Sequence, residues 1–187
     1  MPAVTRLRSM TPKEAFTVAE MHIEPGFAVE RDTLRETAFG FYFHVTTKDY
    51  LRTGDLVDLP VGSCGVLVDR LTGDVHDLGS AFGLEYWLEA YDRGLHLPMD
   101  VVVLSVSDRQ RAASALMRLQ MSYIIPEVAY GETWTIPKHY NQKDFIRSFD
   151  SLPARFGAQR LIFRMHDLDA IDENPDVNIE LELHKGG

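Results

Sequence analysis

The stretch Phe39-Gly40-Phe41-Tyr42-Phe43-His44-Val45 sets the architecture of the first half of this 187-residue chain. Every second residue in it is large and apolar, and a period of two is typical of a β-strand with one face in the core. We therefore expect one row of side chains to be buried, with Tyr42 and His44 on the opposite face. The buried row is expected to consist of Phe39, Phe41, Phe43 and Val45.

A polar connection and then a hairpin follow this strand. Residues 66–69 and 75–78 flank Arg70-Leu71-Thr72-Gly73. Thr-Gly at this place favours a tight turn that is closed by a glycine with positive φ. The sequence therefore predicts a β-hairpin over residues 66–78.

One helix is expected before these strands and one after them. Thr11-Pro12-Lys13-Glu14 has the composition of a capping box, and the helix that it begins should run to about residue 23. A second amphipathic helix is expected over residues 80–94, and a further strand over residues 27–37. The first half therefore predicts an α+β fold, with an antiparallel sheet and helices packed on one of its faces.

Three motifs in this half resemble a known family. They are the aromatic-Gly-aromatic strand, Tyr50-Leu51-Arg52-Thr53-Gly54-Asp55, and Val68-Asp69-Arg70-Leu71-Thr72-Gly73-Asp74-Val75 followed by Leu78-Gly79-Ser80-Ala81. Over residues 11–94 the chain resembles the YrhB-like immunity family of bacterial toxin systems, also called immunity protein 35. The resemblance implies an α+β fold and a protein partner, the cognate toxin, which an immunity protein binds and neutralises.

The second half resembles no family that we recognise. A break at residues 95–98 predicts two units, 1–97 and 98–187, which are either separate domains or parts of one shared sheet. The second unit is expected to follow the order β-α-β-α-β-β, a second α+β arrangement. Its strands are expected at residues 101–106, 128–136, 161–166 and 177–184, and its helices after Ser107 and from Asn141 to Leu152.

Charge and composition favour a protein partner. The net charge of −9 repels phosphate backbones, so nucleic-acid binding is disfavoured and a basic protein partner is favoured. No window approaches the ~20 consecutive apolar residues of a membrane span, and the first ten residues do not resemble a signal peptide. The sequence therefore predicts a soluble, cytoplasmic protein that does not associate with a membrane.

Motifs for catalysis are weak. The seven histidines have no metal-binding spacing, and there is no nucleophile elbow, phosphate-binding loop or dinucleotide fingerprint. The single cysteine, Cys64, excludes an internal disulfide, and we expect it to be a buried residue rather than a nucleophile. We therefore predict no enzymatic activity, no metal and no cofactor.

Candidate binding residues come from an acidic segment and from one strand. Residues 166–176 hold five carboxylates, which are expected either in a solvated turn between two strands or in a loop that enters the basic active-site cleft of a toxin. Tyr42 and His44 are the second candidate. The acidic candidates are Asp167, Asp169, Asp172, Glu173 and Asp176.

The function predicted from these observations is that of an immunity protein, which blocks the active site of a cognate toxin. A chaperone-like or adaptor protein that binds clients through an exposed sheet edge is the alternative, and an enzyme using Cys64 or a histidine is a third reading. The chemistry of the toxin does not follow from the sequence of its inhibitor.

Overall fold

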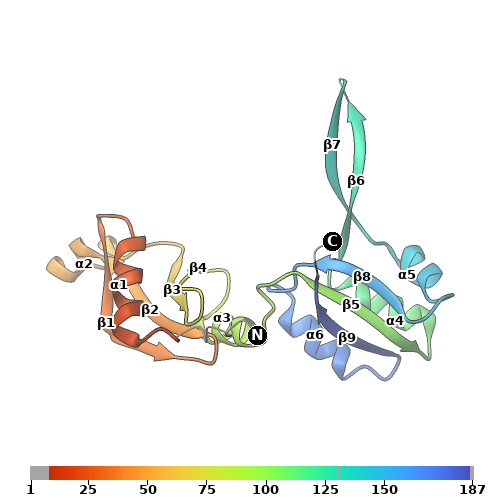
Figure 1. The fold of residues 1–187 in the computed structure, drawn as a ribbon, viewed down its shortest axis with the longest axis horizontal. Coiled ribbons are helices and arrows are strands. Elements are labelled where there is room, and N and C mark those ends of the chain that lie inside the picture. Colours follow the sequence, from red (N-terminus) through yellow and green to blue (C-terminus); the bar gives the residue numbers. More distant parts are fainter. Residues whose placement is uncertain (1–8, 130, 186–187) are drawn as a thin grey trace, which may run out of the picture. The chain divides into compact units, whose positions relative to one another are not determined.

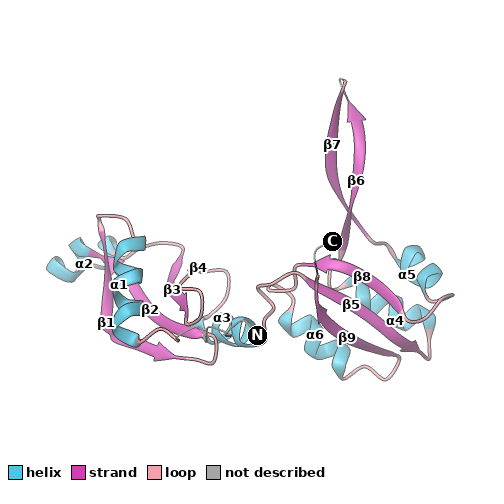
Figure 2. Ribbon diagram, viewed as in Figure 1, coloured by secondary structure: helices cyan, strands magenta, loops and turns pink. Residues whose placement is uncertain are grey.

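The computed structural model describes residues 9–129 and 131–185, and the chain divides into two compact units, Met1–Arg93 and Gly94–Gly187. Figure 2 shows that both units combine helices and strands. Among the described residues, every strand pairs within its own unit. No helix in this described part is long and apolar enough to span a membrane.

Unit 1 is built on a four-stranded antiparallel sheet in the order β1-β2-β3-β4. The predicted hairpin is confirmed as β3 and β4, and Gly73 in its turn has φ of 78°. The elements of the unit are α1 (Pro12–His22), β1 (Phe27–Glu36), β2 (Gly40–Thr47), α2 (Lys48–Thr53), the 3-10 helix η1 (Leu56–Asp58), β3 (Ser63–Asp69), β4 (Val75–Gly79) and α3 (Leu84–Asp92).

Helix α1 covers one face of this sheet. It begins as predicted, because the Thr11 hydroxyl accepts a hydrogen bond from the Glu14 amide and the Glu14 carboxylate accepts one from the Thr11 amide, at 3.3 and 2.8 Å. Its apolar side packs on alternate residues of β2 and β3, which confirms the buried row apart from Phe39. The buried members of this layer are Ala15, Phe16, Ala19, Phe41, Phe43, Val45, Val66 and Val68.

Helix α3 packs on the opposite face of the sheet. Tyr42 pairs with Leu67, and Leu67 with His76, so these three side chains share that face. The ring of Tyr91 on α3 lies 5.0 Å from His76 and 5.1 Å from Phe39. The α+β class is confirmed, and the structure differs from the prediction in that helices cover both faces, so β2 is buried on both sides.

Unit 2 has a three-stranded antiparallel sheet in the order β8-β5-β9 and a separate two-stranded hairpin, β6-β7. Val101 and Val103 of the central strand are fully buried. The elements are β5 (Met99–Val106), α4 (Arg109–Met117), β6 (Ser122–Ala129), β7 (Glu132–His139), α5 (Gln142–Ser148), β8 (Ala154–Gln159), α6 (Met165–Asp172) and β9 (Val177–Leu183).

The predicted strand over residues 128–136 is wrong. A turn at Gly131, which has φ of 79°, divides this segment between the two strands of the β6-β7 hairpin. Strand β6 has Pro126 in its middle, and proline removes a backbone donor from a ladder. In a hairpin with two open edges that loss is tolerated.

The predicted strand over residues 161–166 is also wrong. Strand β8 lies earlier in the chain, and residues after it form helix α6. Leu161, Phe163 and Met165 alternate like a strand, but Met165, Leu168 and Ile171 recur every third residue and are all buried. Phe163, which the alternation would place in the same row, is 52% exposed, so the helical spacing describes the burial. The observed order of the unit is β-α-β-β-α-β-α-β.

Candidate functional site

The connection between β2 and β3 displays aliphatic side chains to solvent. We call residues 48–62, which include α2 and η1, the apolar connection. Val57 is 83% exposed and Val61 is 100% exposed. Exposed apolar groups gathered in one place are typical of binding surfaces, whereas isolated ones are ordinary. The exposed aliphatic members are Leu51, Leu56, Val57, Leu59 and Val61.

Hydrogen bonds fix the shape of the apolar connection. The Thr47 side chain accepts from the Tyr50 amide and caps α2, at 3.0 Å. Gly54 ends this helix with φ of 68°, a conformation that glycine adopts at little cost. Asp55 then caps η1 through the Val57 amide, at 3.0 Å. The Tyr50–Asp55 motif therefore builds a fixed turn that holds the aliphatic side chains outward.

A surface pocket of about 530 Å³ lies where the apolar connection rejoins the sheet. Gly62 and Ser63 form part of its wall, next to the apolar side chains of Phe27 and Val45. His22 Nε2 and the Asp77 carboxylate, 3.2 Å apart, add a polar pair to the same wall. An apolar pocket beside exposed aliphatic residues can receive an anchoring side chain from a partner.

The structure places Tyr42 inside unit 1. Its side chain is buried, and its hydroxyl donates a hydrogen bond of 2.6 Å to the Cys64 carbonyl. Burial raises the pKa of this phenol to about 12. His44 is partly exposed, with Nδ1 2.8 Å from the Glu30 carboxylate. Tyr42 is therefore part of the core of unit 1. A binding role for His44 stays a prediction.

The acidic segment is not a loop between two strands. Four of its carboxylates lie on or just after helix α6, which packs Leu168 and Ile171 into the core. Asp176 accepts from the Ser107 hydroxyl at 2.9 Å and lies 3.6 Å from Arg111. Asp167 faces Arg164 at 3.9 Å and Asp169 is half-buried, whereas Asp172 and Glu173 are exposed. A role for these five residues in binding stays a prediction.

The clearest electrostatic cluster in unit 2 surrounds Asp100. Its carboxylate accepts hydrogen bonds from the Ala158 amide at 3.0 Å and from Arg155 at 2.8 Å, and lies 2.5 Å from His184 Nδ1. These contacts, led by the Ala158 amide, lower the pKa of Asp100 to about 2. The cluster ties β5, β8 and the residue after β9 together, which is a structural role.

By residue type, Cys64 and the histidines are possible catalytic or metal-binding residues. The Cys64 thiol is partly buried and lies 3.6 Å from the Phe82 carbonyl. Within residues 9–129 and 131–185, no three His, Cys, Asp or Glu side chains come together as possible metal ligands. The candidate binding residues that sequence reasoning missed are the exposed aliphatic ones of the apolar connection. Their signal was an apolar run between aspartates without strand or helix periodicity.

Comparison with known proteins relates part of the chain to one bacterial protein. Over 53 residues the chain is 34% identical to a protein of Escherichia coli (strain K12) described as "Uncharacterized protein YrhB". The match covers 28% of this chain and 56% of the relative, so the chain spans about half the length of the curated protein that it matches. No family model and no solved structure matches the chain.

Proposed function

We propose that this protein is an immunity protein, which binds a cognate bacterial toxin and covers its active site. The observation that carries the proposal is the apolar connection, where hydrogen-bonded turns hold five large aliphatic side chains in solvent. Exposing them costs free energy in the isolated protein, and a partner that covers them recovers about 25 cal/mol for each Å² buried.

The position of the motifs supports the same proposal. One of the motifs that resemble the YrhB-like family forms the last four residues of α2 and the turn after it, and its Leu51 is 55% exposed. This motif is Tyr50-Leu51-Arg52-Thr53-Gly54-Asp55. The motif therefore shapes a surface as well as a fold. Asp55 and Asp58 lie among the aliphatic residues, whereas Asp49 is paired with Arg52 at 3.0 Å. Carboxylates beside an apolar centre suit a partner with basic groups.

Co-expression tests the proposal. The gene directly upstream is expected to encode a large protein with a toxin domain at its carboxyl end. In the experiment, that domain is produced in bacteria either alone or together with this protein. Wild type should restore growth and co-purify with the toxin domain. Leu56→Ser combined with Val57→Ser should weaken binding by roughly tenfold or more, because each buried aliphatic side chain contributes about 1.5–3 kcal/mol.

The matched control is Leu34→Ser combined with Leu71→Ser, two exposed leucines of unit 1 outside the apolar connection. This variant should protect and bind like wild type. If wild type neither protects nor binds, the immunity function is wrong. If the Leu56/Val57 variant binds as tightly as the control, the toxin contacts a different surface.

A further inference from the structure

The β6-β7 hairpin is a part of unit 2 that its core does not cover. Every residue of β7 is exposed, and Ile124 and Val128 of β6 are 70% and 73% exposed. Figure 1 shows the hairpin standing clear of the three-stranded sheet of the same unit. An isolated two-stranded hairpin is marginally stable in water, so this one depends on how its base is held.

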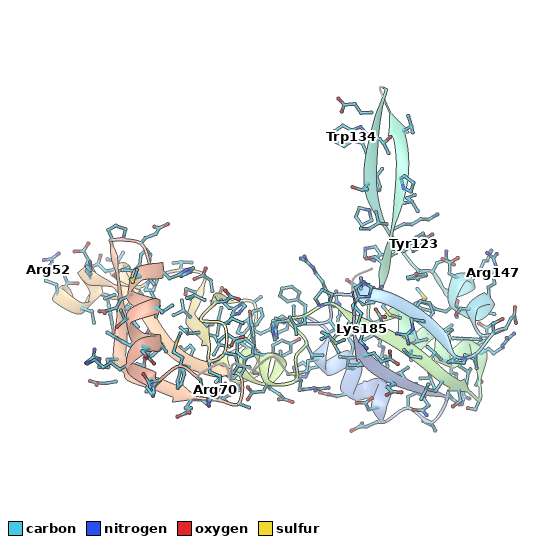
Figure 3. The ribbon with its side chains drawn as sticks, in the orientation of Figure 1. Arg52, Arg70, Tyr123, Trp134, Arg147 and Lys185 are labelled. Atoms are coloured by element: carbon cyan, nitrogen blue, oxygen red, sulfur yellow. The ribbon has the colours of Figure 1, made fainter. Side chains whose placement is uncertain are left out.

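The base of the hairpin is firmly attached. The buried side chain of Gln159 binds both backbone groups of Ser122, accepting from its amide at 2.8 Å and donating to its carbonyl at 2.9 Å. The ring of Tyr140 lies 4.7 Å from Tyr123 and 5.0 Å from Phe156. Figure 3 shows Tyr123 at this end of the hairpin. The hairpin is therefore presented in a defined direction, which lowers the entropy lost on binding.

The two faces of the hairpin differ in charge. Cross-strand pairing places Ile124, Pro126 and Val128 on one face, opposite Pro137, Thr135 and Thr133, and this face carries no charge. On the other face Trp134 lies opposite Glu127, and Glu132 precedes it by two residues. Glu127 and Glu132 are the charged residues along the outer part of this face, and Lys138 lies on the same face at the base of the hairpin, opposite Tyr123. An exposed tryptophan with two carboxylates on the same face suits a positively charged partner.

The edges of the hairpin disfavour strand addition. Pro126 pairs with Thr135, and Pro137 pairs with Ile124. These two pairs are two residues apart along each strand, so their backbone groups have the same orientation in the ladder. Proline has no amide hydrogen, so these positions are the ones whose backbone groups point outward rather than across the ladder. Each outer edge therefore lacks one donor, and a client strand would find an interrupted edge. The contacts of this hairpin must come from its side chains.

The size of the hairpin limits what can bind it. Strands of eight residues at ~3.4 Å each are ~27 Å long, and a ribbon of two strands is roughly 10 Å wide. One face then offers roughly 270 Å², whereas a stable interface takes about 800 Å² from each partner. Two copies packed hairpin to hairpin fall short of this area. A cleft that encloses both faces and the edges approaches it.

We propose that the β6-β7 hairpin inserts into a concave, positively charged cleft of a protein partner, with Trp134 as the apolar anchor and Glu127 and Glu132 as the acidic contacts. The inference rests on the proposed immunity function and adds a second binding element to it: the partner is the toxin domain, and the cleft is its active-site cleft.

Titration calorimetry with the toxin domain of the upstream gene product tests this inference. The hairpin variant combines Glu127→Gln, Glu132→Gln and Trp134→Ala. It should bind roughly 30-fold more weakly or worse, the loss expected for an aromatic anchor. The difference should shrink at 0.5 M salt, where the screening length is about 4 Å, because salt screens the carboxylates. The control combines Glu20→Gln, Met21→Ala and Asp32→Asn, which removes as many charges and one exposed apolar side chain from unit 1.

The outcomes separate the two proposals. If wild type binds and the control keeps its affinity while the hairpin variant loses it, the inference holds. If wild type binds and the hairpin variant binds equally well, the inference is wrong and the immunity function stands. If wild type does not bind, both are wrong. Light scattering on the free protein tests whether the hairpin binds a second copy of this chain instead. A dimer that dissociates in the hairpin variant but not in the control would show self-association and contradict the inference.

Discussion

Strands β2 and β3 of unit 1 and strands β6 and β7 of unit 2 are both antiparallel pairs rich in aromatic and β-branched residues, yet their burial is opposite. Phe43 of β2 and Leu67 of β3 are 1% and 0% exposed, whereas Val128 of β6 and Trp134 of β7 are 73% and 54% exposed. Helices cover both faces of the first pair, and neither face of the second is covered along its length.

The difference shows that strand-forming residues serve two purposes in this chain. In unit 1 they are sealed between α1 and α3 and stabilise the fold. In the hairpin they remain in water, where they contribute little to folding and are available to a partner. The same residue types therefore predict large effects on stability in one pair and large effects on binding in the other.

The largest expected effect on stability is at Phe43. Phe43→Ala should lower the free energy of unfolding by about 3–5 kcal/mol, because it leaves a cavity between the sheet and α1. Trp134→Ala removes a larger side chain but should cost less than ~0.5 kcal/mol, since exposed substitutions seldom do more. Urea unfolding measures both values. Equal losses would remove the distinction between the two strand pairs.

A substitution of Gly65 should have the next largest effect. This glycine has φ of 108°, and a Cβ atom there would lie 2.4 Å from the Phe43 carbonyl oxygen. Gly65→Ala should therefore lower the free energy of unfolding by about 2–4 kcal/mol through backbone strain and overpacking. Gly26→Ala is the control, because a Cβ at Gly26 meets nothing within 4 Å. A neutral result at Gly65 would contradict the close packing of β2 and β3.

Unit 1 could be predicted well because its signals are local. The capping box at Thr11, the alternation in β2 and the Thr-Gly turn each specify one element without reference to distant residues. The burial of Tyr42 could not be read in the same way, because it depends on α3, which packs on the second face only after the chain has folded. The sequence alternation describes one face and does not say what covers the other.

Unit 2 was harder to predict because its patterns are ambiguous. The first residues of 161–171 alternate as in a strand, and the later ones have helical spacing. The burial of Leu168 and Ile171 in the core favours the helix. Strand β6 contains Pro126, and a proline within an apolar run is evidence against a strand. The exposed aliphatic residues of the apolar connection were missed because exposure is a property of the fold, which residue type alone does not give.

The stability of unit 2 should depend on Asp100 in acid. Its pKa of about 2 in the folded protein lies below the ordinary value of 3.8. The carboxylate therefore contributes stability that is fully present above about pH 4 and is lost as the pH falls toward 2. Urea midpoints measured between pH 5 and pH 2 should fall more steeply for wild type than for Asp100→Asn. Parallel curves would show that the cluster around Asp100 contributes nothing in this range.

The smallest effect is expected from shortening the hairpin. Replacing residues 126–135 by Asn-Gly joins Ile125 to Ile136, which are already cross-strand partners, through a favourable two-residue turn. The base contacts of Gln159 remain, so the free energy of unfolding should change by less than ~0.5 kcal/mol. Differential scanning calorimetry can check this. A loss above ~2 kcal/mol would mean that the hairpin is needed for folding.

Hydrogen exchange, measured with and without the toxin domain that the upstream gene is expected to encode, tests most directly whether the exposed apolar residues serve binding. Amides of the buried strands β2, β3 and β5 should exchange slowly in both states. New protection on complex formation should appear in residues 48–62 and 122–139. Protection confined to α6 and its acidic residues, or no new protection in either segment of a formed complex, would contradict the account.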